Sequence, residues 1–183
     1  MPFIIGMKKT IRINLFGAPG SGKSVIAALL FAELKIREHT AELIREVAKE
    51  MIYEGIDIGS DEIQIDIFNT QKHKEDIVIS QTDFLITDSP LLLNAFYSGD
   101  ESILKIAKKK NSKIKNINYW ITRSFFFESE GRRHDQNESD RIDNKMKRFL
   151  TNHGIDFTEI DGESSKIKVE KMLLDLRAKK YIK

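Results

Sequence analysis

The residues with the clearest chemical meaning form the segment GAPGSGKS, residues 17–24. This segment fits the pattern G-x-x-x-x-G-K-[S/T] and stands between a predicted strand and a predicted helix, as that pattern requires. Gly17 and Gly22 permit backbone angles that a Cβ atom would block, so the loop N–H groups and the helix N-terminus can surround an anion. Lys23 would reach the β- and γ-phosphates of a nucleoside triphosphate, and the Ser24 hydroxyl would take a place at Mg²⁺. The residues expected to contact the nucleotide are Gly17, Ala18, Pro19, Gly20, Ser21, Gly22, Lys23, Ser24 and Val25.

A single carboxylate, Asp88, follows the short apolar run FLIT at residues 84–87. Open parallel sheets bind their ligands at the carboxyl ends of strands, which is where Asp88 is predicted to lie. There it would order Mg²⁺ or accept a proton from a substrate hydroxyl. The alternative is structural, with Asp88 or Ser89 capping the helix that begins after Pro90.

Two further polar residues are candidates for binding the molecule that accepts a phosphoryl group. Glu46 follows a second predicted strand, so it would lie at the same edge of the sheet and could bind sugar hydroxyls. Gln71 lies one helical turn from Lys74 on a predicted helix and could hold a base or sugar. The alternative for both residues is a solvated helix surface.

A polar arm, ESEGRRHDQNESDRID at residues 128–143, has no apolar periodicity. It carries Arg132, Arg133 and Arg141, and guanidinium groups bind phosphate oxygens through two parallel hydrogen bonds. We expect residues 128–141 to act as a lid, with Arg132 and Arg141 stabilising the transferring group and Arg133 binding substrate. An exposed loop with balanced charge is the alternative.

The elements that must position these residues alternate between strands and helices. Predicted strands cover residues 10–16, 40–45, 84–87, 118–122 and 157–160. Predicted helices cover residues 23–37, a segment ending at 53, and residues 60–80, 91–97, 101–109, 141–153 and 166–179. This alternation predicts an α/β three-layer sandwich, a mainly parallel sheet of about five strands with helices on both faces. No linker divides residues 1–183, so a single domain is expected.

Composition narrows the classes of protein that fit. The chain has no cysteine, which excludes a disulfide framework, a thiolate metal site and a cysteine nucleophile. The formal net charge of +2 is too small to indicate nucleic acid or membrane as a partner. No apolar run approaches the roughly 20 residues that span a bilayer, and the first residues lack a signal-peptide pattern. A cytoplasmic location is therefore expected.

Five segments in order, with a sixth at the end, carry a resemblance to a known family. They are FGAPGSGKS (16–24), ELIREVAKE (42–50), the helix around Gln71, ITDSPLLL (86–93), the arm at 128–143, and HGIDFTEIDG (153–162). The chain resembles P-loop kinases of the NadR type, whose kinase domain phosphorylates nicotinamide riboside, and a wider phage and bacterial group of AAA-like ATPase or kinase domains.

The resemblance implies a role for several of these residues. Lys23 and Ser24 would bind phosphate and Mg²⁺, Asp88 would be the carboxylate on the acceptor side, and Glu46 would bind the acceptor. Arg132 and Arg141 would belong to the lid. Relatives that make NAD carry a nucleotidyltransferase domain before the kinase, whereas a stand-alone kinase unit is expected here.

Three functions are compatible with the sequence. The leading hypothesis is a kinase that uses ATP and Mg²⁺ to phosphorylate a hydroxyl of a small nucleoside or nucleotide, either nicotinamide riboside-like or a deoxynucleoside or deoxynucleotide. A second is a kinase of a hydroxymethylated pyrimidine base in DNA, with a basic cluster of Lys105, Lys108, Lys109, Lys110, Lys113 and Lys115 following the phosphate backbone. A solvated helix end explains that cluster as well. The third is an ATP-hydrolysing switch that binds a protein partner.

Overall fold

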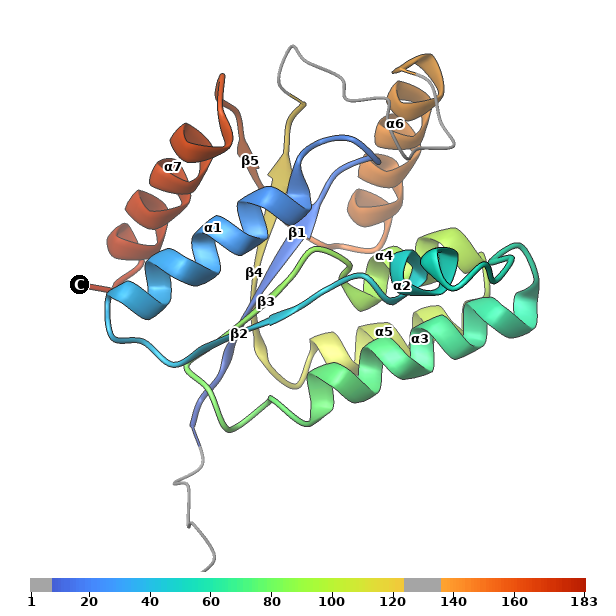
Figure 1. The fold of residues 1–183 in the computed structure, drawn as a ribbon, viewed down its shortest axis with the longest axis horizontal. Helices are drawn as coiled ribbons and strands as arrows, with labels where there is room; N and C mark the ends of the chain where they lie inside the picture. Colours follow the sequence, from blue (N-terminus) through green and yellow to red (C-terminus); the bar gives the residue numbers. More distant parts are fainter. Residues whose placement is uncertain (1–7, 124–135) are drawn as a thin grey trace, which may run out of the picture.

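The computed structural model describes residues 8–123 and 136–183, which form a five-stranded sheet and the helices that cover it (Figure 1). The strands are β1 (Ile11–Phe16), β2 (Ala41–Ile44), β3 (Phe84–Thr87), β4 (Lys115–Ile121) and β5 (Thr158–Ile160). Their order across the sheet is β2-β3-β1-β4-β5, and every neighbouring pair runs parallel. The described helices are α1 (Lys23–Ile36), α2 (Val47–Tyr53), α3 (Asp61–Asp76), α4 (Leu91–Ser98), α5 (Glu101–Asn111), α6 (Gln136–Asn152) and α7 (Ser165–Ala178).

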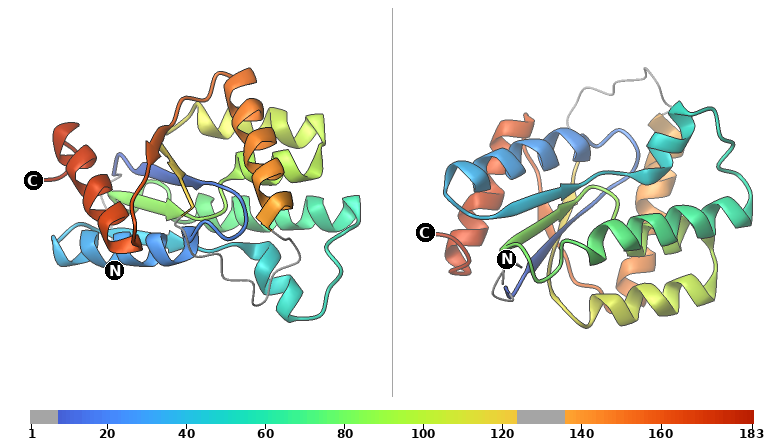
Figure 2. Two further views of the ribbon diagram at one scale, coloured as in Figure 1. Left: turned by 90° about the horizontal axis from the view of Figure 1, so that it is seen from above. Right: turned by 60° about the horizontal axis from the view of Figure 1, so that its bottom comes forward.

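The two faces of the sheet are covered by different sets of helices (Figure 2). Successive side chains of a strand point to opposite faces, and β1 follows this rule. Ile13 and Leu15 pack with buried residues of α1 and α7, whereas Phe16 packs with residues of α3, α4, α5 and α6. The predicted α/β three-layer sandwich is therefore confirmed.

The register of the sheet brings the carboxyl ends of its central strands together. Thr87 of β3 is paired with Asn14 of β1 and with Ile44 of β2. Phe16 at the end of β1 is paired with Trp120 of β4. The segments that follow β1, β2, β3 and β4 consequently leave the sheet at one edge, and this edge carries the predicted site.

Two element boundaries differ from the sequence-based prediction. The helix predicted over residues 60–80 ends at Asp76, because the chain must turn toward β3; Ser80 has a φ of 71° and its N–H donates to Thr10 Oγ1. Strand β4 begins at Lys115, three residues before the predicted start. The start of β4 was missed because asparagine is uncommon in strands. The side chains of Asn116 and Asn118 both accept hydrogen bonds from Asn14 of β1.

The third difference concerns the polar arm. Helix α6 begins at Gln136, so residues 136–141 of the predicted lid belong to a helix. Arg132 and Arg133 lie outside the described residues. Among the described residues, no helix combines the length and the apolar character needed to cross a membrane.

Candidate active site

The phosphate loop has the backbone geometry that its glycines predict. Gly17 has a φ of 141°, and a Cβ atom there would lie 2.8 Å from the carbonyl oxygen of Ile121 and from Ser21 Oγ. Gly22 has a φ of 84° and is the N-cap of α1, with no side-chain cap and no acidic residue in the first turn. The first N–H groups of α1 therefore point into a site without a competing protein carboxylate cap, which suits an anion.

Lys23, the first residue of α1, folds back over this loop. Its Nζ donates hydrogen bonds to the carbonyl oxygens of Gly17 at 2.6 Å and Ala18 at 3.1 Å. Burial raises the pKa of both Glu46 and Asp143, and the charge of the Lys23 ammonium opposes this shift at each, so Lys23 lies near carboxylates from two other elements. Lys23 is thus positioned where the phosphate loop and the acceptor side of the site meet.

Asp88 is buried directly after β3 at the carboxyl edge of the sheet. No described residue donates a hydrogen bond to its Oδ1 atom. The N-cap of α4 is Pro90, without a side-chain cap, so the helix-capping alternative for Asp88 and Ser89 is wrong. A buried carboxylate oxygen without a donor is expensive unless a ligand, water or proton compensates it, and this makes Asp88 a candidate for chemistry.

Glu46 lies at the N-terminus of α2, two residues after β2 ends. Its pKa is raised, chiefly because burial removes water from the carboxylate; Lys23 opposes this shift, Asp88 adds to it, and Lys49 opposes it. Glu46 is half-buried at this helix start and is not a fully solvated residue. The electrostatic interaction with Asp88 and Lys23 indicates that the structure brings these three predicted residues together.

Gln71 is fully buried on α3, where its side chain contacts residues next to Glu46 and Asp88. Its Oε1 accepts a hydrogen bond from the N–H of Val47 at 3.2 Å, and its Nε2 donates to Thr87 Oγ1 at 3.4 Å. These contacts connect the residues next to Glu46 and Asp88. A direct contact with substrate stays a prediction, to which the structure adds a positioning role.

Arg141 is the member of the predicted lid arginines that the structure describes. It lies exposed on α6. Lys74, which shares a face with Gln71, forms an ion pair with Glu50 at 2.6 Å.

Two charged residues of the site escaped the sequence analysis. Asp143 of α6 accepts a hydrogen bond from the N–H of Ala18 at 2.6 Å, and Arg123, two residues after β4, lies 3.2 Å from the Asp143 carboxylate. Burial raises the pKa of Asp143, and the Ala18 N–H, Arg123 and Lys23 oppose that shift. The sequence offers one indication of Asp143, which is an acidic side chain one helical turn after Asp140 at the end of the arginine-rich arm.

Tyr97 on α4 also belongs to this region. Its pKa is raised by loss of solvent around the phenol, with further contributions from Glu46 and Asp143. The residue is 45% exposed, so part of its surface could contact a ligand. No motif in the sequence marks this tyrosine.

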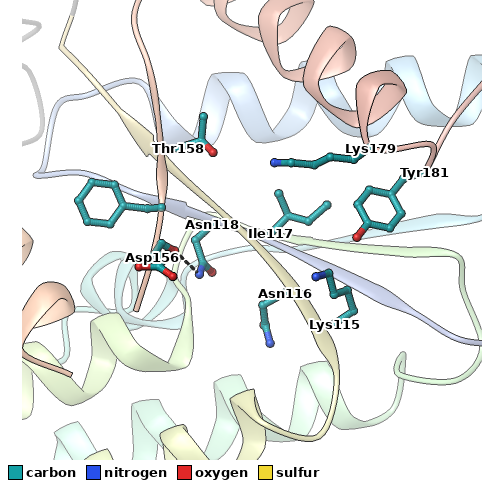
Figure 3. A pocket seen from close by; sticks show the side chains of 9 residues that line it. Lys115, Asn116, Ile117, Asn118, Asp156, Thr158, Lys179 and Tyr181 are labelled. Carbon is teal, nitrogen blue, oxygen red and sulfur yellow. Dashed lines mark hydrogen bonds between the residues drawn. The ribbon is translucent and has the colours of Figure 1, made fainter. Parts of the chain in front are cut away.

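A cavity of about 360 Å³ lies elsewhere, beside the amino-terminal half of β4 (Figure 3). Strand β5 pairs only with Tyr119, Trp120 and Ile121, which leaves β4 unpaired on that side from Lys115 to Asn118. None of the predicted site residues within 8–123 and 136–183 lines this cavity. Its polar groups are partly satisfied within the protein, since Asn118 Nδ2 donates to the carbonyl oxygen of Asp156 at 2.8 Å.

The fold is similar to those of solved kinases. Thymidylate kinase from Ehrlichia chaffeensis aligns with a TM-score of 0.66 at 15% identity, over 91% of this chain and 98% of that chain. Deoxyadenosine kinase from M. mycoides, solved with dCMP and a flexible dCDP, aligns with a TM-score of 0.62 at 18% identity over the same shares. NadR protein in complex with NR aligns with a TM-score of 0.64 at 13% identity, over 93% of this chain and 50% of that chain.

These structural similarities establish the fold, a P-loop fold of the nucleoside and nucleotide kinase type. No curated protein matches the sequence at a significant level. A family model described as an AAA domain, AAA_28, matches residues 12–166 and so includes β1, the phosphate loop, Asp88, Asp143 and the start of α7. Since this match covers most of the chain, the protein belongs to the AAA_28 family of AAA domains.

Proposed function

We propose that this protein is a kinase that uses ATP and Mg²⁺ to phosphorylate a hydroxyl group of a nucleoside or nucleotide. The observation that carries the proposal is the convergence of Lys23, Glu46 and Asp88 at one edge of the sheet. A triphosphate bound by the loop would present its γ-phosphate end near Lys23, and an acceptor would need polar groups close to that end. Glu46 and Asp88 supply such groups.

The chain's own residues would act mainly by positioning and electrostatics. The first turn of α1 and the Lys23 ammonium would bind phosphate oxygens, after Lys23 leaves the carbonyl oxygens of Gly17 and Ala18. The Asp88 carboxylate would accept the proton of the attacking hydroxyl, because its Oδ1 has no donor among the described residues. Glu46 would hold acceptor hydroxyls, and Arg132, Arg133 and Arg141 would stabilise charge on the phosphates.

The residues present fit Mg²⁺. This cation prefers oxygen ligands, and it usually binds one or two carboxylates together with substrate phosphates. The exposed hydroxyl of Ser24 in the first turn of α1 would hold it directly, and the Asp88 carboxylate would order it through water. When bound, Mg²⁺ would neutralise part of the negative charge on the β- and γ-phosphates.

The acceptor class is supported by the solved structures of similar fold. Their names describe kinases of thymidylate and deoxyadenosine, and a NadR protein in complex with NR. A nucleoside or nucleotide acceptor is the element that these names share. A cytoplasmic location, where such molecules and ATP meet, belongs to the same proposal.

The basic cluster predicted for a DNA acceptor lies on the wrong side of the molecule for that role. Lys115 begins β4, whose opposite end leads to the site, and Lys108, Lys109 and Lys110 form the last turn of α5 just before it. The register places Lys115 level with Phe84, so Asp88 lies four residues, roughly 13 Å, further along the strand direction and two strands away, and DNA bound at this cluster would lie apart from it. Lys110 also forms an ion pair with Asp76 at 2.6 Å. A small acceptor is therefore the better proposal.

An acceptor screen tests the function. The purified protein with Mg-ATP would be offered nicotinamide riboside, nucleosides, deoxynucleosides, their monophosphates and hydroxymethyl-pyrimidine DNA. We expect ADP formation that depends on a small acceptor and a phosphorylated product detected by mass spectrometry. ADP formation that ignores every acceptor would instead favour the ATP-hydrolysing switch.

A further inference from the structure

A hydrogen bond joins the phosphate loop to a helix that lies 125 positions later in the chain. The N–H of Ala18 donates to Asp143 Oδ1 at 2.6 Å. The other carboxylate oxygen of Asp143 lies 3.2 Å from Arg123 Nη2, and Arg123 Nη1 lies 2.9 Å from Asp140 Oδ1. Three segments therefore meet at one carboxylate: the loop after β1, the residues after β4, and α6.

The three charged groups differ in their exposure to solvent. The side chain of Arg123 is 11% exposed and that of Asp143 is 24% exposed, whereas that of Asp140 is 59% exposed. Ion pairs with solvent-exposed partners contribute little, while a charge-assisted hydrogen bond away from water contributes more. Asp143 is accordingly the carboxylate that joins α6 to the loop, and Asp140 is a peripheral partner of Arg123.

The backbone of Ala18 makes several of the hydrogen bonds that fix the conformation of the phosphate loop. Its side chain is completely buried, and its carbonyl oxygen accepts hydrogen bonds from the N–H of Ser21 at 3.2 Å and from Lys23 Nζ at 3.1 Å. Asp143 holds the N–H of the same residue. A change at Asp143 would therefore alter the peptide group next to which the Lys23 ammonium rests.

We propose that Asp143 is a positioning residue for nucleotide binding, which fixes the entry of the phosphate loop by accepting the Ala18 N–H and attaches α6 to it. This inference rests on the proposed function, because it assumes that the loop binds a nucleotide. Asp143 acts through the loop backbone and does not itself contact phosphate.

The opposite role would be competition, in which the carboxylate occupies part of the anion site and the triphosphate displaces it. Two observations favour positioning. Arg123 neutralises the Asp143 charge, and the bonded N–H belongs to Ala18 at the loop entry, ahead of the uncapped N–H groups that begin at Lys23. The two roles predict opposite changes in nucleotide affinity when the carboxylate is removed.

Direct binding of Mg-ATP to four proteins tests the proposal. Asp143→Ala removes the acceptor, Asp143→Asn keeps Oδ1 without the charge, and Asn144→Ala, at the exposed next position of α6, is the control. We expect roughly tenfold weaker Mg-ATP binding for Asp143→Ala, rescue to within about threefold by Asp143→Asn, and no change for Asn144→Ala. Unchanged or tighter binding by Asp143→Ala, or equal losses in Asp143→Ala and Asp143→Asn, would overturn the proposal.

Amide hydrogen exchange provides a measurement that needs neither activity nor a stable variant. In the wild-type protein the Ala18 N–H should exchange at least tenfold more slowly than that of Gly20, for whose N–H no acceptor is found within the described residues. Fast exchange at Ala18 would contradict the hydrogen bond directly. If the wild-type protein binds no Mg-ATP, the proposed function fails, whereas the exchange rate still tests the contact.

Discussion

At the scale of single residues, the proposed function assigns different roles to Lys23 and Asp88. Lys23 would border both the nucleotide and the acceptor, because it contacts the phosphate loop and also affects the Glu46 carboxylate. Asp88 has a buried oxygen to which no residue in the described part of the chain donates, and it is the proposed acceptor-side carboxylate. Substitutions of these two residues should therefore produce different kinetic defects.

Lys23→Ala should abolish phosphoryl transfer and weaken Mg-ATP binding by at least tenfold. The ammonium is the loop's own cation for the β- and γ-phosphates, and no other side chain of α1's first turn carries a positive charge. Calorimetric titration with Mg-ATP measures the loss of affinity. Lys35→Ala, an exposed lysine in the last turn of the same helix, is the control and should leave binding unchanged.

Asp88→Asn should keep Mg-ATP binding while lowering kcat by roughly 10²- to 10⁴-fold. The amide has nearly the same shape as the carboxylate but cannot accept the proton of an acceptor hydroxyl. Steady-state kinetics, together with a nucleotide titration, separate turnover from binding. Asp66→Asn on the exposed surface of α3 serves as the matched control. Wild-type turnover by Asp88→Asn would show that Asp88 has no such role.

The limit of sequence reasoning is also clearest at single residues. The backbone geometry of the phosphate loop could be predicted from the spacing of its glycines after a strand, and the place of Asp88 from the apolar run that precedes it. Asp143 could not be predicted, since its partner Ala18 is 125 positions away and only the docking of α6 brings them together. Tyr97 is similar, because its importance comes from Glu46 and Asp143 on other elements.

At the scale of elements, tertiary contacts determine where α3 ends and where β4 begins. Apolar periodicity predicted most helices and strands, but it extended α3 to residue 80 because Ile77 continues the apolar pattern. The observed turn follows from tertiary contacts, in which Thr10 and Lys8 bind the backbone of Ser80. Likewise the polar start of β4 is a strand because β1 pairs with it from Lys115 onward.

The side chain of Gln71 couples three elements, and Gln71→Leu should therefore affect both stability and the acceptor side. The substitution leaves the Val47 N–H without its acceptor and removes one donor to Thr87 Oγ1, which keeps the Ser89 N–H; the lost acceptor costs about 1–3 kcal/mol of unfolding free energy. The acceptor KM should rise, because Val47 and Thr87 are adjacent to Glu46 and Asp88, while Mg-ATP affinity stays unchanged.

Chemical denaturation and separate KM measurements for the two substrates test this expectation. Lys74→Ala is the control on the same helix, since it removes only the ion pair with the half-exposed Glu50. Such pairs contribute at most about 1 kcal/mol. Equal effects of Gln71→Leu on both substrates would show that the amide acts on the whole site and not on its acceptor side.

At the scale of the whole molecule, the candidate site and a buried ion pair lie at opposite ends of the sheet. The candidate site lies at the carboxyl ends of the strands. Near the amino ends, Arg12 of β1 and Glu75 of α3 form an ion pair with an N–O distance of 3.4 Å, and both side chains are 1% exposed. Arg12 Nη1 also donates to Asn111 Oδ1 at 3.3 Å, which adds α5 to the contact. This buried group of charges should control how stability depends on pH without touching the site.

The stability of the protein should fall as the pH rises from 4.5 to 7, relative to that of Glu75→Gln. Burial raises the pKa of Glu75 from 4.5 to about 7; Arg12 opposes this shift, Asp76 adds to it, and Lys110 opposes it. In this window the folded protein holds a proton that the unfolded chain releases, so rising pH favours unfolding. Glu75→Gln cannot titrate and should lack this loss, which urea unfolding at several pH values would measure. Asp76→Asn, which removes a neighbouring and partly exposed carboxylate, is the control for loss of a negative charge. A wild-type stability that increases over this window relative to Glu75→Gln would mean that Arg12 lowers the pKa of Glu75 by more than burial raises it.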